Sequence, residues 1–134
     1  MIRQGASTLF TAVMLLVATN AAAADRVQAG EWETKMTIGT GKPIVTKYCI
    51  TPDEARSMNG DEATLRKYLV ESTAEKTGGR CLIRTVTLKD DVTTVAIVCG
   101  KTEVVTSTTY QGNRYESSSS NGAKVAGKRL GACP

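Results

Sequence analysis

Alternating apolar and polar residues predict a hairpin near the start of the chain's globular part. Between Gly30 and Ile38, the odd-numbered residues are polar or charged, whereas the even-numbered residues include Trp32 and other apolar side chains. The same alternation runs through residues 44–50, after a turn at residues 39–42. A period of two with one apolar face is typical of a half-buried strand. The two segments are therefore predicted to pair as an antiparallel hairpin.

Two short helices are predicted to follow this hairpin. Thr51 supplies an N-cap hydroxyl, Pro52 takes the first helical position, and Glu54 completes a capping box. The first helix should end by Asn59, and Asp61 can cap a second helix. Three residues share the apolar face of the second helix: Leu65, Tyr68 and Leu69. We expect both helices to lie across one side or one end of the sheet.

Residues 81–88 and 92–99 predict a second hairpin, because they are rich in Val, Ile and Thr and flank a turn at Asp90. Folding this hairpin symmetrically about Asp90 sets three facing pairs: Cys81 with Cys99, Ile83 with Ile97, and Thr85 with Val95. The second of these strands is apolar on both faces. We therefore expect it to be central in the sheet and covered on both sides.

A third, more polar hairpin is predicted from residues 103–110 and 114–120. They flank a turn at residues 112–113, with Tyr110 facing Tyr115. Most of the other facing pairs join Thr to Ser, so this hairpin has little apolar surface to bury. It is predicted to be an edge ribbon or one wall of a polar groove.

The tail, residues 122–134, is punctuated by glycines and is predicted to hold one short strand that ends at Cys133. The whole pattern predicts a mainly β fold with a small helical insertion. We expect an antiparallel meander of about six strands, arranged as a curled sheet or partial barrel, with the helices between strands two and three.

Residues 1–24 have the order of a secretory signal peptide. Arg3 supplies a positive charge, residues 9–17 are apolar, and four alanines precede Asp25. The apolar run is shorter than the roughly 20 residues that cross a bilayer, and no later segment is apolar enough to do so. We expect cleavage before Asp25 and a single soluble domain over residues 25–134 in an oxidising compartment, the periplasm.

All four cysteines lie after the predicted cleavage site. An even number in an exported chain indicates disulfides, and no two are two to four residues apart as a zinc site would require. Hairpin symmetry favours Cys81 with Cys99, because facing residues of a non-hydrogen-bonded pair lie about 4.5 Å apart at Cα. Cys49 is then left to pair with Cys133. The alternative, Cys49 with Cys81 and Cys99 with Cys133, remains open if the hairpin register slips.

The charge balance is mildly basic. The chain has 17 Lys and Arg against 13 Asp and Glu, a formal net charge of +4. Loss of Arg3 with the signal peptide would leave 16 against 13, or +3. The basic residues are scattered, apart from Lys124, Lys128 and Arg129. Nucleic-acid binding typically needs a denser basic stripe interleaved with stacking rings, so no nucleic-acid partner is predicted.

The sequence contains no histidine. This excludes Ser-His-Asp and Cys-His catalysis and imidazole metal sites. The chain also has no glycine-rich phosphate loop and no Cys-x-x-Cys pair. Among the acids, Glu31 and Glu33 point outward from their strand, and helix capping explains Asp53 and Glu54. We therefore expect a protein that is not an enzyme and that holds no metal or cofactor.

Five landmarks occur in an order that resembles a known family. They are residues 30–33 (GEWE), 49–55 (CITPDEA), the hairpin 81–99, residues 110–115 (YQGNRY) and residues 129–134 (RLGACP). As a set they resemble the DUF3617 family of small exported bacterial proteins, whose function is uncharacterised. The resemblance covers nearly the whole mature chain and implies no catalytic residue. The turn at residues 90–91 departs from the Gly-Asn type of turn expected there.

A second resemblance rests on two residues. The Gly30-x-Trp32 opening is similar to that of lipocalins and of small exported protease inhibitors with lipocalin-like barrels. However, the mature chain is short for an eight-stranded barrel that encloses a ligand.

Two functional hypotheses follow. The first is a monomeric, non-enzymatic binding or envelope-maintenance module that holds a small apolar or mixed ligand against the concave face, at Trp32, Met36, Tyr48 and Ile97. The second is an inhibitor or protein-partner-binding domain that uses an exposed loop or edge strand. A pocket lined by the four residues would favour the first, and an exposed apolar patch over a solid core the second. An enzyme would instead need two carboxylates within about 10 Å of each other in one cleft.

Overall fold

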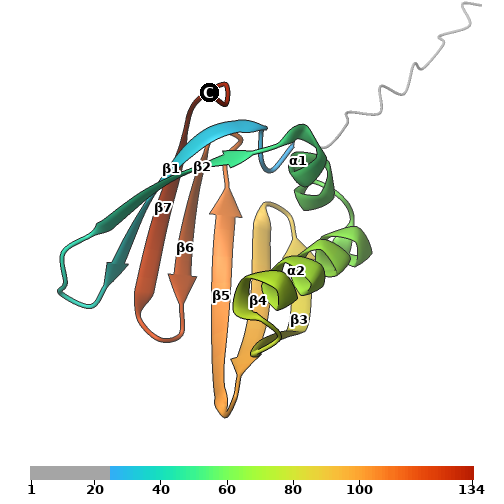
Figure 1. The fold of residues 1–134 in the computed structure, drawn as a ribbon, viewed down its shortest axis with the longest axis vertical. Coiled ribbons are helices and arrows are strands. Elements are labelled where there is room, and N and C mark those ends of the chain that lie inside the picture. The colour runs from blue at the N-terminus through green and yellow to red at the C-terminus, as the bar shows by residue number, and fades with distance from the viewer. Residues whose placement is uncertain (1–24) are drawn as a thin grey trace, which may run out of the picture.

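The computed structural model describes residues 25–134, so the signal peptide predicted for residues 1–24 lies outside the described residues. Seven strands and two helices follow one another along this part of the chain (Figure 1). Their bounds are β1 (Gly30–Ile38), β2 (Ile44–Ile50), α1 (Pro52–Met58), α2 (Glu62–Thr77), β3 (Cys81–Lys89), β4 (Val92–Cys99), β5 (Thr102–Tyr110), β6 (Arg114–Ser119) and β7 (Ala123–Gly131).

All seven strands form one antiparallel sheet in the order β2-β1-β7-β6-β5-β4-β3. The sheet does not close, because its two edges are β2 and β3, and the two helices connect those edges. The predicted fold class is therefore confirmed: a mainly β meander with helices between strands two and three. The tail differs from the predicted short strand, because it forms β7, a nine-residue strand between β1 and β6.

The two faces of the sheet differ in whether a helix packs on them and in the charge of their side chains. Trp32 faces Tyr48 on β2 and Arg129 on β7, and we call this side of the sheet the inner face. Helix α2 lies over the inner face at β3 and β4 (Figure 1). The neighbouring residues Glu31 and Glu33 alternate to the opposite, outer face. The inner face is thus half covered, and the rest of it is open.

The core lies at one end of the inner face, where the chain enters β1 and leaves β2. Trp32 is fully buried there, together with Val27, Ile50 and Ala55. The Trp32 indole Nε1–H donates to the carbonyl of Gln28 at 2.9 Å, so its one polar atom is satisfied. We call this the closed end of β1 and β2, and the opposite end, toward their connecting turn, the open end.

Both helix caps and both favoured disulfides are confirmed. The Thr51 side chain accepts from the Glu54 N–H at 3.2 Å, and the Glu54 carboxylate accepts from the Thr51 N–H at 2.9 Å, which is a complete capping box. Asp61 caps α2. The disulfides, with their Cα–Cα distances, are Cys49–Cys133 at 5.6 Å and Cys81–Cys99 at 4.2 Å.

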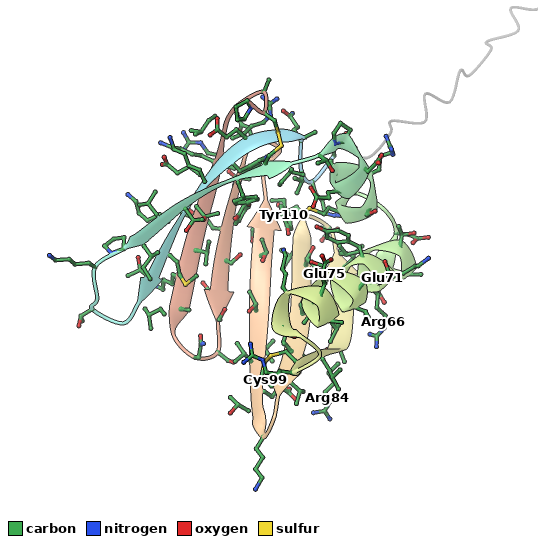
Figure 2. The ribbon with its side chains drawn as sticks, viewed as in Figure 1. Arg66, Glu71, Glu75, Arg84, Cys99 and Tyr110 are labelled. Carbon is green, nitrogen blue, oxygen red and sulfur yellow. A yellow bond between two sulfur atoms is a disulfide. The ribbon has the colours of Figure 1, made fainter. Side chains whose placement is uncertain are left out.

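The predicted register of the β3–β4 hairpin is partly wrong. Cys81 faces Cys99 as predicted, but Thr85 faces Ala96 instead of Val95. The connecting loop has two residues, and Asp90 takes a positive φ of 55° in it, so the register near the turn is shifted by one residue. A bulge at Arg84 then removes the shift, and the exposed backbone carbonyl of Arg84 accepts from the Arg66 side chain of α2 at 3.2 Å (Figure 2).

Two predicted positions in the sheet are also wrong. Strand β4 is next to the edge and has a helix over its inner face only, rather than lying in the centre under two layers. The β5–β6 hairpin lies in the middle of the sheet and not at its edge. Its polar side chains are tolerated there because they bond to one another: Thr108 to Ser117 at 2.7 Å and Thr106 to Ser119 at 2.8 Å.

Candidate functional site

A hollow of about 360 Å³ lies between the closed end of the sheet and the two helices. Three tyrosines from three different elements meet in it: Tyr48 of β2, Tyr68 of α2 and Tyr115 of β6. We call it the tyrosine hollow. Its remaining lining residues are Cys49, Ile50, Glu54, Met58, Leu69, Ser72 and Lys76.

Each tyrosine is positioned by its element. Tyr48 is the cross-strand neighbour of the core residue Trp32. Tyr115 faces Gly127 on β7, and its ring lies directly over this glycine, where any Cβ atom would collide with the ring. Tyr68 lies on α2 at a spacing of four from Ser72, which places the two on one side of the helix.

Direct contacts hold the aromatic residues together. The hydroxyl groups of Tyr48 and Tyr115 share a hydrogen bond of 2.9 Å. The Tyr115 ring also packs against the Trp32 ring at a centroid distance of 5.6 Å and against the Tyr110 ring at 5.8 Å. Figure 2 shows Tyr110 on the inner face, at the end of β5 near the helices. The hollow therefore has an aromatic floor that is continuous with the core.

The phenol groups of this cluster are neutral at neutral pH, and burial extends their neutral range to higher pH. It raises the pKa of Tyr110 to about 12, and it raises the pKa of Tyr115 further, with a smaller contribution from the hydrogen bond to Tyr48. The pKa of Tyr48 is also raised by burial, as is that of Tyr68, where the nearby Glu54 carboxylate adds to the effect. At neutral pH these groups act as hydrogen-bond donors and apolar surface, not as bases or nucleophiles.

The hollow contains one acid and one base. The Glu54 carboxylate is engaged at the start of α1, where it accepts from the Thr51 N–H. Lys76 lies two turns of α2 beyond Tyr68 and forms no ion pair within residues 25–134. Lys76 is therefore the one base in the lining, and it remains available to an anionic group of a ligand.

The four predicted ligand-binding residues share the inner face but do not meet at one site. Tyr48 lines the tyrosine hollow, whereas Trp32 is 0% exposed and belongs to the core beneath it. Met36 is 38% exposed and lies four residues along β1 from Trp32. Ile97 lies on β4, and strands β7, β6 and β5 separate it from β1.

Sequence reasoning missed Tyr68, Lys76 and Tyr115 as lining residues. A usable signal was present on α2, because Tyr68, Ser72 and Lys76 follow at intervals of four and so form one stripe. No local pattern indicates that this stripe faces β2 and β6, since that depends on how the helices return across the sheet.

The outer face has a second hollow, of about 310 Å³, over β1, β7 and β6. Charged residues of both signs line it, and Glu33 is ion-paired with Lys128 at 3.6 Å. Such mixed, partly paired charges are typical of a solvated sheet face. Within residues 25–134, no cluster of three acidic or cysteine side chains could hold a metal ion, and neither helix is long and apolar enough to span a membrane.

Fold and site together define a class of protein: a small disulfide-linked domain in which two helices cover half of one face of an open antiparallel sheet, above a tyrosine-lined hollow. Residues 27–133 match the family model of DUF3617, a protein of unknown function. The chain therefore belongs to the DUF3617 family, as its resemblance to that family predicted. Comparison with curated proteins and with solved structures gave no match.

Proposed function

We propose that this protein is an exported, non-enzymatic binding module that holds a small apolar or mixed ligand on the inner face of its sheet. The observation that carries the proposal is the tyrosine hollow, a concave site of about 360 Å³ with apolar walls and a few convergent polar groups. Ligand sites in proteins typically have this composition.

Two further observations support the cellular context. The chain has two disulfides, and such bonds persist in oxidising compartments such as the periplasm. Residues 1–24 have the order of a signal peptide. A non-enzymatic role is supported by the absence of histidine from the sequence and by the neutral state of the buried tyrosines.

Native mass spectrometry of protein purified from the periplasm tests this proposal. We expect a fraction with the mass of residues 25–134 plus one small molecule, which is lost on denaturation. Tyr68→Ala removes one wall of the hollow and should abolish the adduct, whereas Arg114→Ala, on the outer face, should not. If the wild type carries no adduct, or if Tyr68→Ala carries the adduct to the same extent, the proposal is contradicted.

A second candidate function, partner binding, is favoured by a different observation. At the open end of β1 and β2, three large apolar side chains on the inner face are exposed: Met36 at 38%, and Ile38 and Ile44 at 57% each. Exposed apolar patches mark interaction sites. In the same experiment, a co-purifying protein that is lost from Ile38→Asp but not from Tyr68→Ala would favour this candidate.

A further inference from the structure

The open part of the inner face is almost free of charge. Inner-face positions on β1, β2, β5 and β6 carry apolar, hydroxyl or aromatic side chains. On β7 the exception is Arg129, whose Nε donates to the carbonyl of Ala29 at 2.8 Å and is thereby engaged at the closed end. The outer face of the same strands bears Glu33, Lys35 and Lys128. A ligand that lies along the inner face should therefore be uncharged over that length.

An apolar stripe runs along this open surface. Met36 faces Ile44 on β2 and Val125 on β7, and Ile38 follows two residues later on the same face of β1. Ile44 lies four residues from Tyr48 on β2, which is about 14 Å along a strand. The stripe of Met36, Ile38 and Ile44 therefore begins well away from the tyrosine hollow and continues away from it. This geometry fits an elongated ligand better than a compact one.

The hollow supplies hydrogen-bond donors at one end of this surface. In the Tyr48–Tyr115 pair one hydroxyl donates to the other, so one O–H hydrogen remains for a ligand. The Ser72 hydroxyl and the Lys76 ammonium line the same hollow. These donors complement an anionic headgroup. Glu54, the one acid in the lining, keeps its negative charge but is held at the start of α1 by the Thr51 N–H.

We infer that the ligand is a long-chain carboxylate. Its carboxylate lies in the tyrosine hollow near Lys76, and its alkyl chain lies along the inner face toward the apolar stripe. This inference rests on the proposed function and adds to it the chemical class of the ligand. The assignment follows from charge complementarity at one end of the site and from the uncharged, elongated surface that leads away from it.

Trp32 provides a direct readout, because it is the single tryptophan of the chain and packs on Tyr115, a lining residue. Delipidated, disulfide-bonded protein is titrated with hexadecanoate, hexadecanol and butanoate, and binding is followed by Trp32 fluorescence and calorimetry. We expect hexadecanoate to bind about tenfold or more tightly than hexadecanol, which lacks the charge-assisted hydrogen bonds. Butanoate, which has the headgroup but no long chain, should show no binding.

Three variants separate the two ends of the site. Lys76→Gln should weaken hexadecanoate binding about tenfold and leave hexadecanol binding unchanged. Ile44→Lys should weaken both ligands, because it places a charge in the path of the chain, and the exposure of Ile44 allows the variant to fold. Lys35→Gln, on the outer face, should change neither.

The outcomes distinguish the inference from the proposed function. Equal binding of the acid and the alcohol, unaffected by Lys76→Gln, would overturn the headgroup assignment and leave the binding function in place. Failure of both long-chain probes, together with a native mass spectrum without an adduct, would overturn both. A dimer seen by sedimentation without any probe, and dissociated by Ile44→Lys, would assign the stripe to a second copy of the chain and overturn the inference.

Discussion

The two ends of the β1–β2 hairpin belong to the same face of the same pair of strands, yet they differ in burial. At the closed end, Trp32 is 0% exposed and Ile50 is 4% exposed. At the open end, Ile38 and Ile44 are each 57% exposed. The difference arises because α1 and the segment around Val27 pack on the closed end, whereas no element of residues 25–134 packs on the open end.

This contrast separates two roles of apolar residues. At the closed end, apolar side chains are transferred out of water on folding, and their burial stabilises the folded state. At the open end they remain in water, so the same residue types contribute little to folding and keep their surface available to a ligand or partner. Strand alternation indicates which side of a strand is apolar. Whether that side becomes part of the core or stays open as a binding surface depends on which other elements pack over it.

Removal of the disulfides should give the largest loss of stability. Removal of Cys49–Cys133, at the closed end, should cost more than removal of Cys81–Cys99. The cysteines of Cys49–Cys133 are 84 residues apart, whereas those of Cys81–Cys99 are 18 apart. The chain-entropy model predicts losses of about 4.5 kcal/mol for Cys49→Ala/Cys133→Ala and about 3 kcal/mol for Cys81→Ala/Cys99→Ala. Urea unfolding measures both free energies. A larger loss for Cys81→Ala/Cys99→Ala would contradict the prediction that the closed-end disulfide contributes more to stability.

One substitution made at both ends of β2 tests burial directly. Ile50→Ala should lower the free energy of unfolding by about 3 kcal/mol, because it leaves a cavity beside Trp32. Ile44→Ala, on the same face of the same strand, should change it by less than about 0.5 kcal/mol. Equal losses in chemical denaturation would show that the open end is covered in solution.

Features set by neighbouring residues were predictable from the sequence. The β1–β2 hairpin, the Thr51 capping box and the facing of Cys81 with Cys99 depend on alternation, capping chemistry and turn position. The length of β7 was not predictable in this way, because glycine weakens a strand pattern. Gly127 is required by the Tyr115 ring above it, which is a tertiary contact.

The candidate site was less predictable than the fold. The sequence correctly predicted that Trp32, Met36, Tyr48 and Ile97 share one face of the sheet. The prediction that they form one binding site was wrong. Alternation assigns a side of the sheet and carries no information on strand order, so it cannot show that three strands separate Ile97 from Met36. The tyrosine hollow likewise depends on where α2 returns over the sheet.

Alkaline pH should lower the free energy of unfolding through ionisation of the Tyr110 phenol. Burial raises the pKa of this phenol to about 12 in the folded state, so the unfolded state, with a pKa near 10, loses its proton first as pH rises. Stability should therefore be unaffected by this group below pH 10 and fall by about 2 kcal/mol by pH 12. Urea unfolding of wild type and Tyr110→Phe over this range measures the difference. A parallel loss in both proteins would contradict the assignment to Tyr110.

The smallest expected effect concerns the cap that holds α1 over the closed end. Helix α1 contributes Ala55 to the core, and the Asn59 side chain that follows it bonds to both the N–H and the carbonyl of Val27, at 2.9 and 2.7 Å. Thr51→Ala removes the acceptor for the Glu54 N–H and should cost about 1 kcal/mol, whereas Thr51→Ser retains it and should cost a few tenths. Urea midpoints measure both values. If the two variants are equally stable, the capping box does not help to hold α1 in place, and the burial of the closed end rests on the Val27 and Trp32 contacts alone.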